Sequence, residues 1–419
     1  MRILIASKFL HYVGGVETYV RWQAWALHQH GVEVGLLGME PPTDRPLMDL
    51  PEVPRWTTAH RSYEAGASHR AVSAAMSVWS PEAGATMKRA LAEFKPDLVH
   101  FHGTCYQLTP SVVRETVNAD VPSILTAHEY KLMCANQNLL DDQTKAMCRV
   151  CVGASPTQKF RNTVGRSCMK SSRAVSLLGA TEQLVSVPTW RRADPRIITP
   201  SSFMRDQLVE DGWDGGRIHY LDLPWRKEDD DVMAAPGPRD SILFMARLAP
   251  MKGPHRLLTA WAQVAADYPE VTLRLAGDGE QGPELEARVR DERIPRVEFL
   301  GLLTRDQLSD ALSRALISVH PSQNAENSPF SVRESLMEGV PALVSRVGGM
   351  PEMISPQTGW SVPFDDDAAW ADGLRTALDQ GLAAQPSLLE AVRRRALTDE
   401  DHLTALLGHY DAELTARSR

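Results

Sequence analysis

Two glutamates in one short stretch could act on opposite ends of a single ligand. Seven residues separate Glu326 from Glu334, and eight positions along a continuous helix are about two turns, which would put both carboxylates on roughly one face. Pro329 stands between them, however, and proline is disfavoured inside a helix but favoured at its first position. We therefore predict a helix over 330–338 capped by Ser328. Glu326 then lies in the loop before the helix and Glu334 lies within it.

This arrangement suits a ligand that carries a diphosphate. A helix N-terminus offers unpaired backbone N–H groups and the positive end of the helix dipole, which favour phosphate. An acid on each side of such a site would meet hydroxyl groups at both ends of the diphosphate, as in a sugar nucleotide. Arg247 and Lys252 follow another apolar run and bring cations suited to the same diphosphate. The alternative is that all four are solvated surface residues.

Short apolar runs recur in two series along the chain, and they must position these residues. The runs are continuous rather than alternating, which indicates parallel sheets buried on both faces. The charged, proline-rich stretch "DLPWRKEDDDVMAAPGPRD" separates the two series and has the composition of a linker. We predict an α/β protein with two Rossmann-like, doubly wound domains that face each other across a cleft. Ligands of such sheets bind beyond the carboxyl ends of the strands.

Composition excludes several classes of protein. The 419 residues are 43% hydrophobic and 23% charged, with a formal net charge of −8, whereas a nucleic-acid-binding protein is usually basic. No stretch approaches the roughly 18 apolar residues of a membrane-spanning helix. The first residues lack a cleavage site of the signal-peptide type. We therefore expect a cytoplasmic protein that does not bind nucleic acid.

Seven motifs, taken in their order along the chain, resemble glycosyltransferase family 4. Two lie in the first half, "GGVETY" at 14–19 and "PDLVHFH" at 96–102, and five in the second: "ARLAPMKG", "AGDGE", "FLG", "HPSQNAENSPFSVRESLMEGVPALVS" and "GGMPE". The resemblance covers nearly the whole chain. It implies the GT-B fold and the transfer of a sugar from a nucleotide-diphosphate donor to an acceptor hydroxyl, with retention of configuration and without a catalytic metal.

The resemblance also implies a role for each residue of the second half. Glu326 would contact hydroxyls of the donor sugar at the reacting face, and Glu334 would hold the ribose. Arg247 and Lys252 would neutralise the leaving diphosphate, which is an electrostatic contribution to catalysis. Backbone N–H groups of the loop before the helix would bind the sugar and the β-phosphate; its residues are Asn327, Ser328, Pro329 and Phe330.

In the first half, the resemblance points to two glycines and a histidine. Gly14 and Gly15 would let the backbone approach the donor phosphate. His128 ends a strand candidate and matches the family's active-site histidine, near the transferred sugar. His100 and His102 are adjacent candidates, and His102 could face the acceptor. The other interpretation of each is a histidine of the core.

These assignments also predict where the domains begin and end. We expect an acceptor-side domain over 1–222 with a cysteine-rich insertion at 134–168, a linker over 223–240 and a nucleotide-sugar-binding domain over 241–385. The helices of 386–419 are expected to pack back on the N-terminal domain. The acceptor is a sugar, a lipid-linked sugar or a small metabolite.

Four cysteines gather in the insertion. Cys134, Cys148, Cys151 and Cys168 have the spacing C-x13-C-x2-C-x16-C, which can supply four thiolates to tetrahedral zinc. Similar stretches mark a cysteine-bearing subset of the family. We predict a structural zinc beside His128; an iron–sulfur cluster and metal-free thiols are the alternatives.

The same segment is basic. A solvated face is the preferred interpretation, and attraction of an anionic acceptor or a lipid carrier at a membrane surface is the other. The residues are Lys159, Arg161, Arg166, Lys170 and Arg173.

Three functions other than sugar transfer are compatible with parts of the sequence. "GDGEQG" at 277–282 satisfies the G-x-G-x-x-G pattern of NAD-dependent oxidoreductases, but Glu284 and Glu286 follow it too soon to bind the ribose, and the pattern leaves Arg247 and the glutamate pair without a role. A glycoside phosphorylase or a nucleotide-sugar epimerase on the same fold would use the same phosphate site. A non-catalytic nucleotide-sugar-binding protein is the third.

Overall fold

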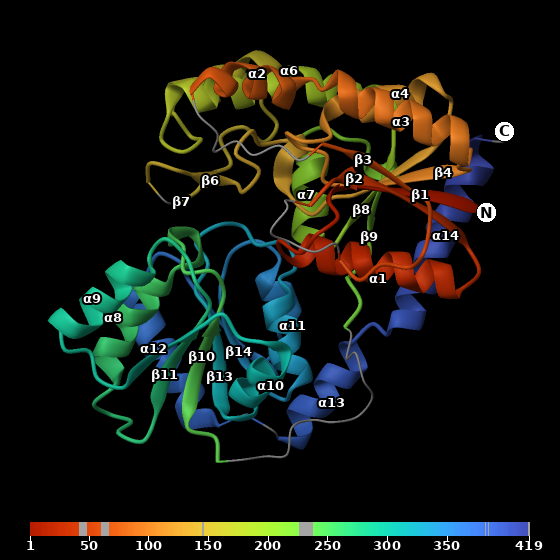
Figure 1. Ribbon diagram of the computed structural model, residues 1–419. Coiled ribbons are helices and arrows are strands. Elements are labelled where there is room, and N and C mark those ends of the chain that lie inside the picture. Colours follow the sequence, from red (N-terminus) through yellow and green to blue (C-terminus); the bar gives the residue numbers. More distant parts are fainter. Residues whose placement is uncertain are drawn as a thin grey trace. The chain divides into compact units, whose positions relative to one another are not determined.

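The computed structural model describes residues 1–41, 48–59, 67–144, 146–225, 238–381, 383 and 385–417 (Figure 1). Most of the predicted linker, residues 226–237, lies outside this part. The chain divides into two compact units. The first comprises Met1–Gln143, Cys148–Leu223 and Asp399–Arg419, and the second comprises Thr144–Met147 and Pro224–Thr398.

A seven-stranded sheet forms the centre of the first unit, in the order β3-β2-β1-β4-β5-β8-β9. All its described pairs are parallel. Its strands are β1 (Arg2–Phe9), β2 (Glu33–Met39), β3 (Arg55–Thr58), β4 (Leu98–His102), β5 (Ser123–Thr126), β8 (Arg196–Thr199) and β9 (Ile218–Tyr220).

The helices of the first unit are α1 (Gly15–Gln29), α2 (Ala67–Val78), α3 (Pro81–Phe94), α4 (Thr109–Asn118), α5 (Pro156–Gly165), α6 (Arg173–Ala193), α7 (Ser202–Glu210) and α14 (Asp399–Arg417). Shorter elements are β6 (Leu140–Asp141), η1 (Tyr130–Leu132) and η2 (Gly215–Arg217). The C-terminal helix α14 is held to this unit by its buried Glu413, whose Oε1 accepts a hydrogen bond from Arg217 Nη2 at 2.9 Å.

The second unit contains a six-stranded parallel sheet in the order β12-β11-β10-β13-β14-β15. Figure 1 shows α8 and α9 on one side of this sheet and α10 and α11 on the other. Its strands are β10 (Ser241–Met245), β11 (Thr272–Ala276), β12 (Val297–Gly301), β13 (Ala315–His320), β14 (Ala342–Ser345) and β15 (Gly359–Val362).

The helices of the second unit are α8 (Pro254–Val264), α9 (Gly282–Asp291), α10 (Arg305–Ser313), α11 (Phe330–Met337), α12 (Asp367–Gln380) and α13 (Pro386–Arg395). Shorter elements are β7 (Ala146–Met147), η3 (Pro250–Lys252) and η4 (Met350–Met353).

Both sheets confirm the predicted α/β class. Central strands are buried on both faces, as their continuous apolar runs predict: Ile3, Leu4 and Ile5 of β1 are 0% exposed. In each sheet the strand order reverses at one point, between β1 and β4 in the first and between β10 and β13 in the second. Ligands of doubly wound sheets bind at such switch points, beyond the carboxyl ends of the strands. The fold therefore marks two places to inspect.

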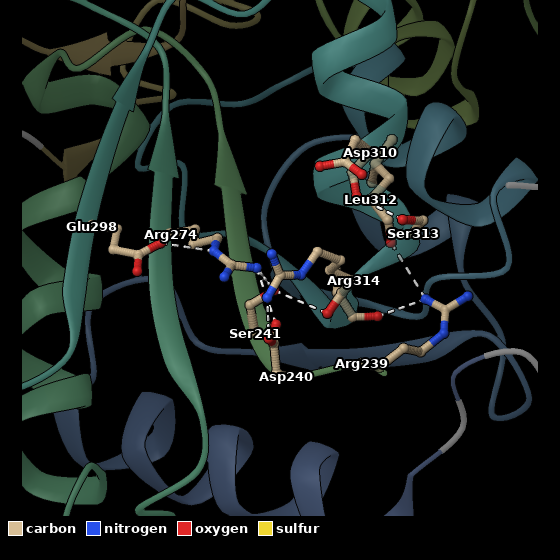
Figure 2. Close-up of polar contacts among 10 residues, drawn as sticks. Arg239, Asp240, Ser241, Arg274, Glu298, Asp310, Leu312, Ser313 and Arg314 are labelled. Atoms are coloured by element: carbon tan, nitrogen blue, oxygen red, sulfur yellow. Dashed lines mark hydrogen bonds and ion pairs between the residues drawn. The ribbon is translucent and has the colours of Figure 1, made fainter. Parts of the chain in front are cut away.

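At the opposite end of the second sheet, where its strands begin, charged residues form a network of hydrogen bonds (Figure 2). We call this end the amino edge of the sheet, and the end where the strands finish the carboxyl edge. Arg274, on β11, donates from Nη1 to Asp240 Oδ1 at 3.0 Å and from Nε to Glu298 Oε2 at 2.9 Å. Arg314 also bonds Asp240. Arg239 donates to the carbonyl oxygen of Ala315 at 2.6 Å. This network ties together the starts of neighbouring strands.

Among the helices described, none is long and apolar enough to cross a membrane.

Candidate active site

The predicted site residues follow the strands at the two switch points. In the second unit, Arg247 and Lys252 lie between β10 and α8, and Glu326 lies between β13 and α11. In the first unit, Gly14 follows β1 and His128 follows β5, the neighbour of β4. The sequence order of strands and loops thus places them at the edge where ligands bind.

Lys252 and Glu326 form an ion pair. Lys252 Nζ lies 2.5 Å from Glu326 Oε1, with 25% and 14% of the two side chains exposed. The two loops are joined by their backbones, since Gln323 N donates to Met251 O at 2.8 Å. Gly253 makes the contact possible: its φ is +70°, and a Cβ there would lie 2.1 Å from Pro321 O. A cation and a carboxylate are therefore held side by side.

The "GGMPE" motif fixes the backbone of Glu326. Gly349 N donates to Glu326 O at 2.7 Å. Gly348 has a φ of +65°, and a Cβ on it would lie 2.2 Å from Glu326 O. Any side chain at this position would displace the glutamate.

The glycine-rich turn at 277–282 packs against the Arg247 loop. A Cβ on Gly277 would lie 2.0 Å from Ala246 O, and one on Gly279 would lie 2.4 Å from Leu248 O. Leu248 N donates to Asp278 O at 2.9 Å. Close backbone approach within the chain therefore accounts for these glycines, and the dinucleotide interpretation is not needed. Arg247 itself is exposed.

The start of α11 differs from the prediction. The N-cap is Pro329, without a side-chain cap, and the helix ends at Met337 rather than at 338. Ser328 does not cap because its Oγ accepts a hydrogen bond from Arg333, whose Nη1 also donates to Ser328 O at 3.0 Å. Glu334 is exposed on the helix.

Arg333 is a residue of this site that sequence reasoning missed. It is 2% exposed, and its guanidinium lies over the rings of Phe330 and Trp225, at 5.6 and 5.8 Å from their centroids. It therefore fixes the shape of the loop that contains Asn327 and Ser328, each 9% exposed. A charged residue among buried neighbours on a short helix was the available signal.

In the first unit, α1 begins at Gly15 with Gly14 as its N-cap. Gly14 N donates to Glu17 Oε2 at 2.8 Å, and burial raises the pKa of this glutamate. A Cβ on Gly14 would meet only Glu17 Oε2, at 3.9 Å. Packing within the chain therefore does not require this glycine, and its role toward the donor phosphate stays a prediction.

The three candidate histidines lie together. His128 Nε2 is 3.1 Å from His102 Nδ1, and the rings of His100 and His102 stack with centroids 4.3 Å apart. His100 and His102 are fully buried, and burial lowers the pKa of His128 to about 4. All three are therefore neutral at physiological pH. Sequence reasoning found these histidines but not the residues of α1 and α14 that bind them.

The four predicted cysteines line one cavity of about 20 Å³, together with Leu139 and Leu140. Such a volume holds about one water-sized particle. Burial and the neighbouring thiols raise the pKa of Cys151 to about 11 and that of Cys168 to about 12. Nevertheless, no group of three or more potential ligands in the described residues is arranged to hold a metal ion. The thiols are thus gathered around one cavity, without a preformed metal site in the part of the chain that the structure describes.

The basic segment is only partly solvated. Lys159 is 8% exposed and its Nζ lies 2.5 Å from Asp211 Oδ1, so the prediction of a solvated side chain is wrong for this residue. It was wrong because the basic run gives no sign that α5 packs against the end of α7. The other four members are exposed: Arg161, Arg166, Lys170 and Arg173.

Two protein families match the sequence. Residues 14–224 match the "Glycosyl transferase 4-like domain", and residues 226–396 match "Glycosyl transferases group 1". A glycogen synthase of Mycobacterium tuberculosis (strain CDC 1551) is 29% identical over 255 residues, 57% of this chain and 58% of the relative. A D-inositol 3-phosphate glycosyltransferase of Corynebacterium efficiens is 33% identical over 146 residues, 33% of this chain and 34% of the relative. The chain thus matches little more than half the length of the first relative.

Solved structures resemble the whole chain. Anabaena HepE in complex with UDP has a TM-score of 0.67 at 16% identity and covers 98% of this chain, with 100% of HepE covered. The sucrose-phosphate synthase of Thermosynechococcus elongatus has a TM-score of 0.69 at 18% identity, and the match covers 99% of each chain. At these identities the likeness shows the fold, which is GT-B, as the sequence motifs imply.

Proposed function

The chain belongs to glycosyltransferase family 4, and from this premise we propose that it transfers a sugar from a nucleotide-diphosphate sugar to an acceptor hydroxyl, with retention of configuration. We propose that the second unit binds the donor and that the first contributes Gly14, Gly15 and His128. The acceptor side would lie in 1–222, as the family resemblance suggests.

One observation carries this proposal: the pair Lys252–Glu326, 2.5 Å apart, stands with Arg247 at the switch point of the second sheet. An ammonium beside a carboxylate offers one group to phosphate oxygens and the other to sugar hydroxyls. An ion pair that only stabilised the fold would not have to lie at the carboxyl ends of the strands. Gly253 and Gly348, which hold this pair there, have no room for a side chain.

These groups suggest how the reaction proceeds. When the bond between the sugar and the diphosphate breaks, negative charge grows on the leaving phosphate, and Lys252 and Arg247 would stabilise it. Glu326 would orient the sugar through its hydroxyls. The leaving phosphate would take the acceptor's proton on the same face, so the site needs no separate general base. Glu334 would hold the ribose.

Donor binding is the first test. Calorimetry and thermal shift with UDP, GDP, ADP, dTDP and NAD(P) should show one preferred nucleoside diphosphate. UDP is the first choice because the HepE structure contains it. Binding of NAD(P) alone would overturn the proposal and favour an oxidoreductase.

Paired variants separate the two glutamates. Glu326→Ala should reduce transfer by a factor of about 100 or more, in the range of a lost electrostatic contact to the transition state, while nucleotide affinity is kept. Glu334→Ala should weaken nucleotide binding instead. Full transfer activity of Glu326→Ala would refute the assignment.

The remaining alternatives have distinct signatures. A glycoside phosphorylase would release a sugar phosphate with inorganic phosphate, and an epimerase would convert the donor sugar without an acceptor. A binding protein would bind the nucleotide and catalyse neither reaction. Product analysis with and without phosphate distinguishes the three.

We also propose that Cys134, Cys148, Cys151 and Cys168 bind a structural zinc ion. The support is that all four line a single cavity of atomic size. Zinc would require small movements of the thiols, since the described side chains do not form a metal site as they stand. The ion would cross-link the loops that follow His128.

Elemental analysis tests this second proposal. Protein purified without chelator should contain about one zinc per chain, and Cys151→Ser should lose it. Iron with an absorption band in the visible range would favour the iron–sulfur alternative. Absence of both metals would leave four free thiols.

A further inference from the structure

A chain of hydrogen bonds runs behind His128 through the interior of the first unit. We propose that Gln23 and His102 are positioning residues that hold His128 in the neutral tautomer with its proton on Nε2. The functional meaning rests on the proposed role of His128 at the transferred sugar. The tautomer itself can be measured without any substrate.

Secondary structure brings the members of this chain together. His100 and His102 are two positions apart on β4 and so lie on the same face of the sheet. Gln23 lies on α1, and Tyr410 lies on α14, near the end of the sequence. These four side chains are 0% exposed, so each polar atom needs a partner within the protein.

The Gln23 amide sets the direction of the bonds. Its Oε1 lies 2.7 Å from His102 Nε2, and an amide oxygen can only accept. His102 therefore carries its proton on Nε2, and, being neutral, has a lone pair on Nδ1. His128 Nε2 lies 3.1 Å from this Nδ1 and must donate to it. Neutral His128 is then left with a lone pair on its own Nδ1.

The other end of the amide contacts His100 and Tyr410. Gln23 Nε2 lies 2.7 Å from His100 Nδ1 and donates to Tyr410 Oη at 2.8 Å. His100 Nε2 lies 2.8 Å from Thr126 Oγ1 and donates to it. If the amide were reversed, every bond in the chain would reverse with it, and His128 would carry its proton on Nδ1. The Gln23 orientation thus decides the tautomer.

A second anchor holds the rings in place. His402 Nδ1 lies 2.8 Å from the carbonyl oxygen of Asp222 and must donate to it. His402 Nε2 is then an acceptor for Tyr19 Oη, at 2.8 Å. The Tyr19 ring packs edge-on against His102 and His128, with centroids 5.5 and 5.6 Å away. Tyr19 and Gln23, one helical turn apart on α1, thus fix position and tautomer respectively.

The tautomer of His128 decides whether its Nδ1 can accept or donate a hydrogen bond to a ligand. Neither His102 nor His100 is charged, because burial holds the pKa of each well below its usual value. When His128 donates its Nε2 proton to His102, its Nδ1 is left as a hydrogen-bond acceptor. It would bind a hydroxyl group and would not act as an acid.

Nitrogen-15 NMR tests the tautomer directly. In protein labelled with 15N-histidine, long-range proton–nitrogen correlations distinguish the two neutral forms, and the His128 signals are those absent from His128→Gln. We expect the Nε2-protonated form in the wild-type protein. The Nδ1-protonated form would overturn the proposal.

Gln23→Glu challenges the same chain from the other side. A carboxylate attracts protons on both neighbouring histidines, so His102 would become an imidazolium that donates from Nδ1 to His128 Nε2. His128 should then switch to the Nδ1-protonated form. An unchanged His128 tautomer in folded Gln23→Glu would also count against the proposal.

A matched pair at position 102 links the tautomer to catalysis. The asparagine of His102→Asn can place an amide oxygen near the position of Nδ1, whereas the similar-sized leucine of His102→Leu cannot. We expect kcat to fall on the order of tenfold in His102→Leu, as for a lost hydrogen bond, and to recover largely in His102→Asn. Equal loss in both variants would show a packing role only.

Failure of this proposal and failure of the proposed function look different. If His128→Ala kept full transfer activity, the role of His128 would be refuted while the NMR result stood. If His128→Ala were inactive and the wild-type tautomer were Nδ1-protonated, only the role of Gln23 and His102 would be refuted.

Discussion

The two edges of the second sheet carry the same kinds of side chain and use them differently. At the amino edge, Arg274 and Arg314 share Asp240, and Arg274, itself 8% exposed, also bonds Glu298 (Figure 2). At the carboxyl edge, Lys252 pairs with Glu326 but is 25% exposed, and Arg247 extends into solvent. Both edges pair their charges, and exposure does not separate the pairs, since Asp240, Glu298 and Arg314 are 31%, 51% and 42% exposed. The carboxyl edge differs in having Arg247, which follows β10 and is exposed.

Residue type alone therefore does not separate an ion pair that stabilises the sheet from one that is proposed to bind a ligand. What separates them is the strand end, since loops at the carboxyl edge meet at a switch point and loops at the amino edge do not. Variants at the two edges should therefore affect different quantities.

The largest effect is expected from Lys252→Ala. Loss of a cation at the leaving diphosphate should lower kcat/KM for sugar transfer by a factor of about 100 to 1,000, with little change in the free energy of unfolding. Steady-state kinetics and urea unfolding measure the two. The control Arg290→Ala removes a cation that is 72% exposed on α9 and should change neither.

Asp240→Asn should act on stability alone. It removes one of the two carboxylates that bond the buried Arg274, the other being that of Glu298, and losing one partner of a buried pair costs about 3 kcal/mol or more. Because Asp240 is 31% exposed, we expect about 2 kcal/mol in urea unfolding. Nucleotide affinity should stay unchanged. A weakened affinity would mean that the edges are not independent, and Asp291→Asn, at an exposed pair, is the control.

Gly348→Ala should lower both the rate of sugar transfer and the free energy of unfolding. A methyl group would lie 2.2 Å from Glu326 O at a φ of +65°, so Glu326 must move, and transfer should fall about tenfold as for a misplaced catalytic group. Gly381→Ala separates the causes, because its φ is +55° and nothing lies within 4 Å. It should cost only the strain of left-handed backbone, about 1 kcal/mol. Equal kinetics in both variants would contradict the positioning role of Gly348.

The smallest effect concerns His320, at the carboxyl end of β13. Burial, aided by the charge of Lys252, lowers the pKa of His320 to about 3 from its ordinary value of 6.5. The unfolded chain therefore binds a proton below pH 6.5 that the folded chain does not, and stability falls as the pH falls through this range. Its other neighbours are the hydroxyls of Ser318 and Ser331.

Urea unfolding at pH 7.5 and at pH 5.5 measures the contribution of His320 to the pH dependence of stability. One such histidine contributes about 1 kcal/mol over that interval, so His320→Asn should show a pH dependence smaller by this amount than the wild-type protein. His28→Asn, on the exposed end of α1, is the control. An identical pH dependence in His320→Asn would show that His320 is protonated in the folded state.

Much of the fold, and the placement of the candidate residues at strand ends, were predictable from local pattern. Continuous apolar runs located the strands of both sheets, and Pro329 correctly divided the glutamate pair between loop and helix. The Ser328 cap was wrong because Arg333, a residue of the same helix, competes for the hydroxyl. Burial of an arginine depends on the Trp225 and Phe330 rings beside it, and no local pattern announces that packing.

By itself, the sequence determined which residues are candidates for chemistry and which strand ends present them, because strand and helix periodicity and glycine placement are local properties. Only the tertiary structure decided how these residues are paired. It brought Tyr410 to Gln23 and His100 across more than three hundred residues, placed the four cysteines around one cavity, and paired Lys252 with Glu326. Such pairing follows from the packing of distant segments, since buried polar groups must find partners wherever the fold provides them.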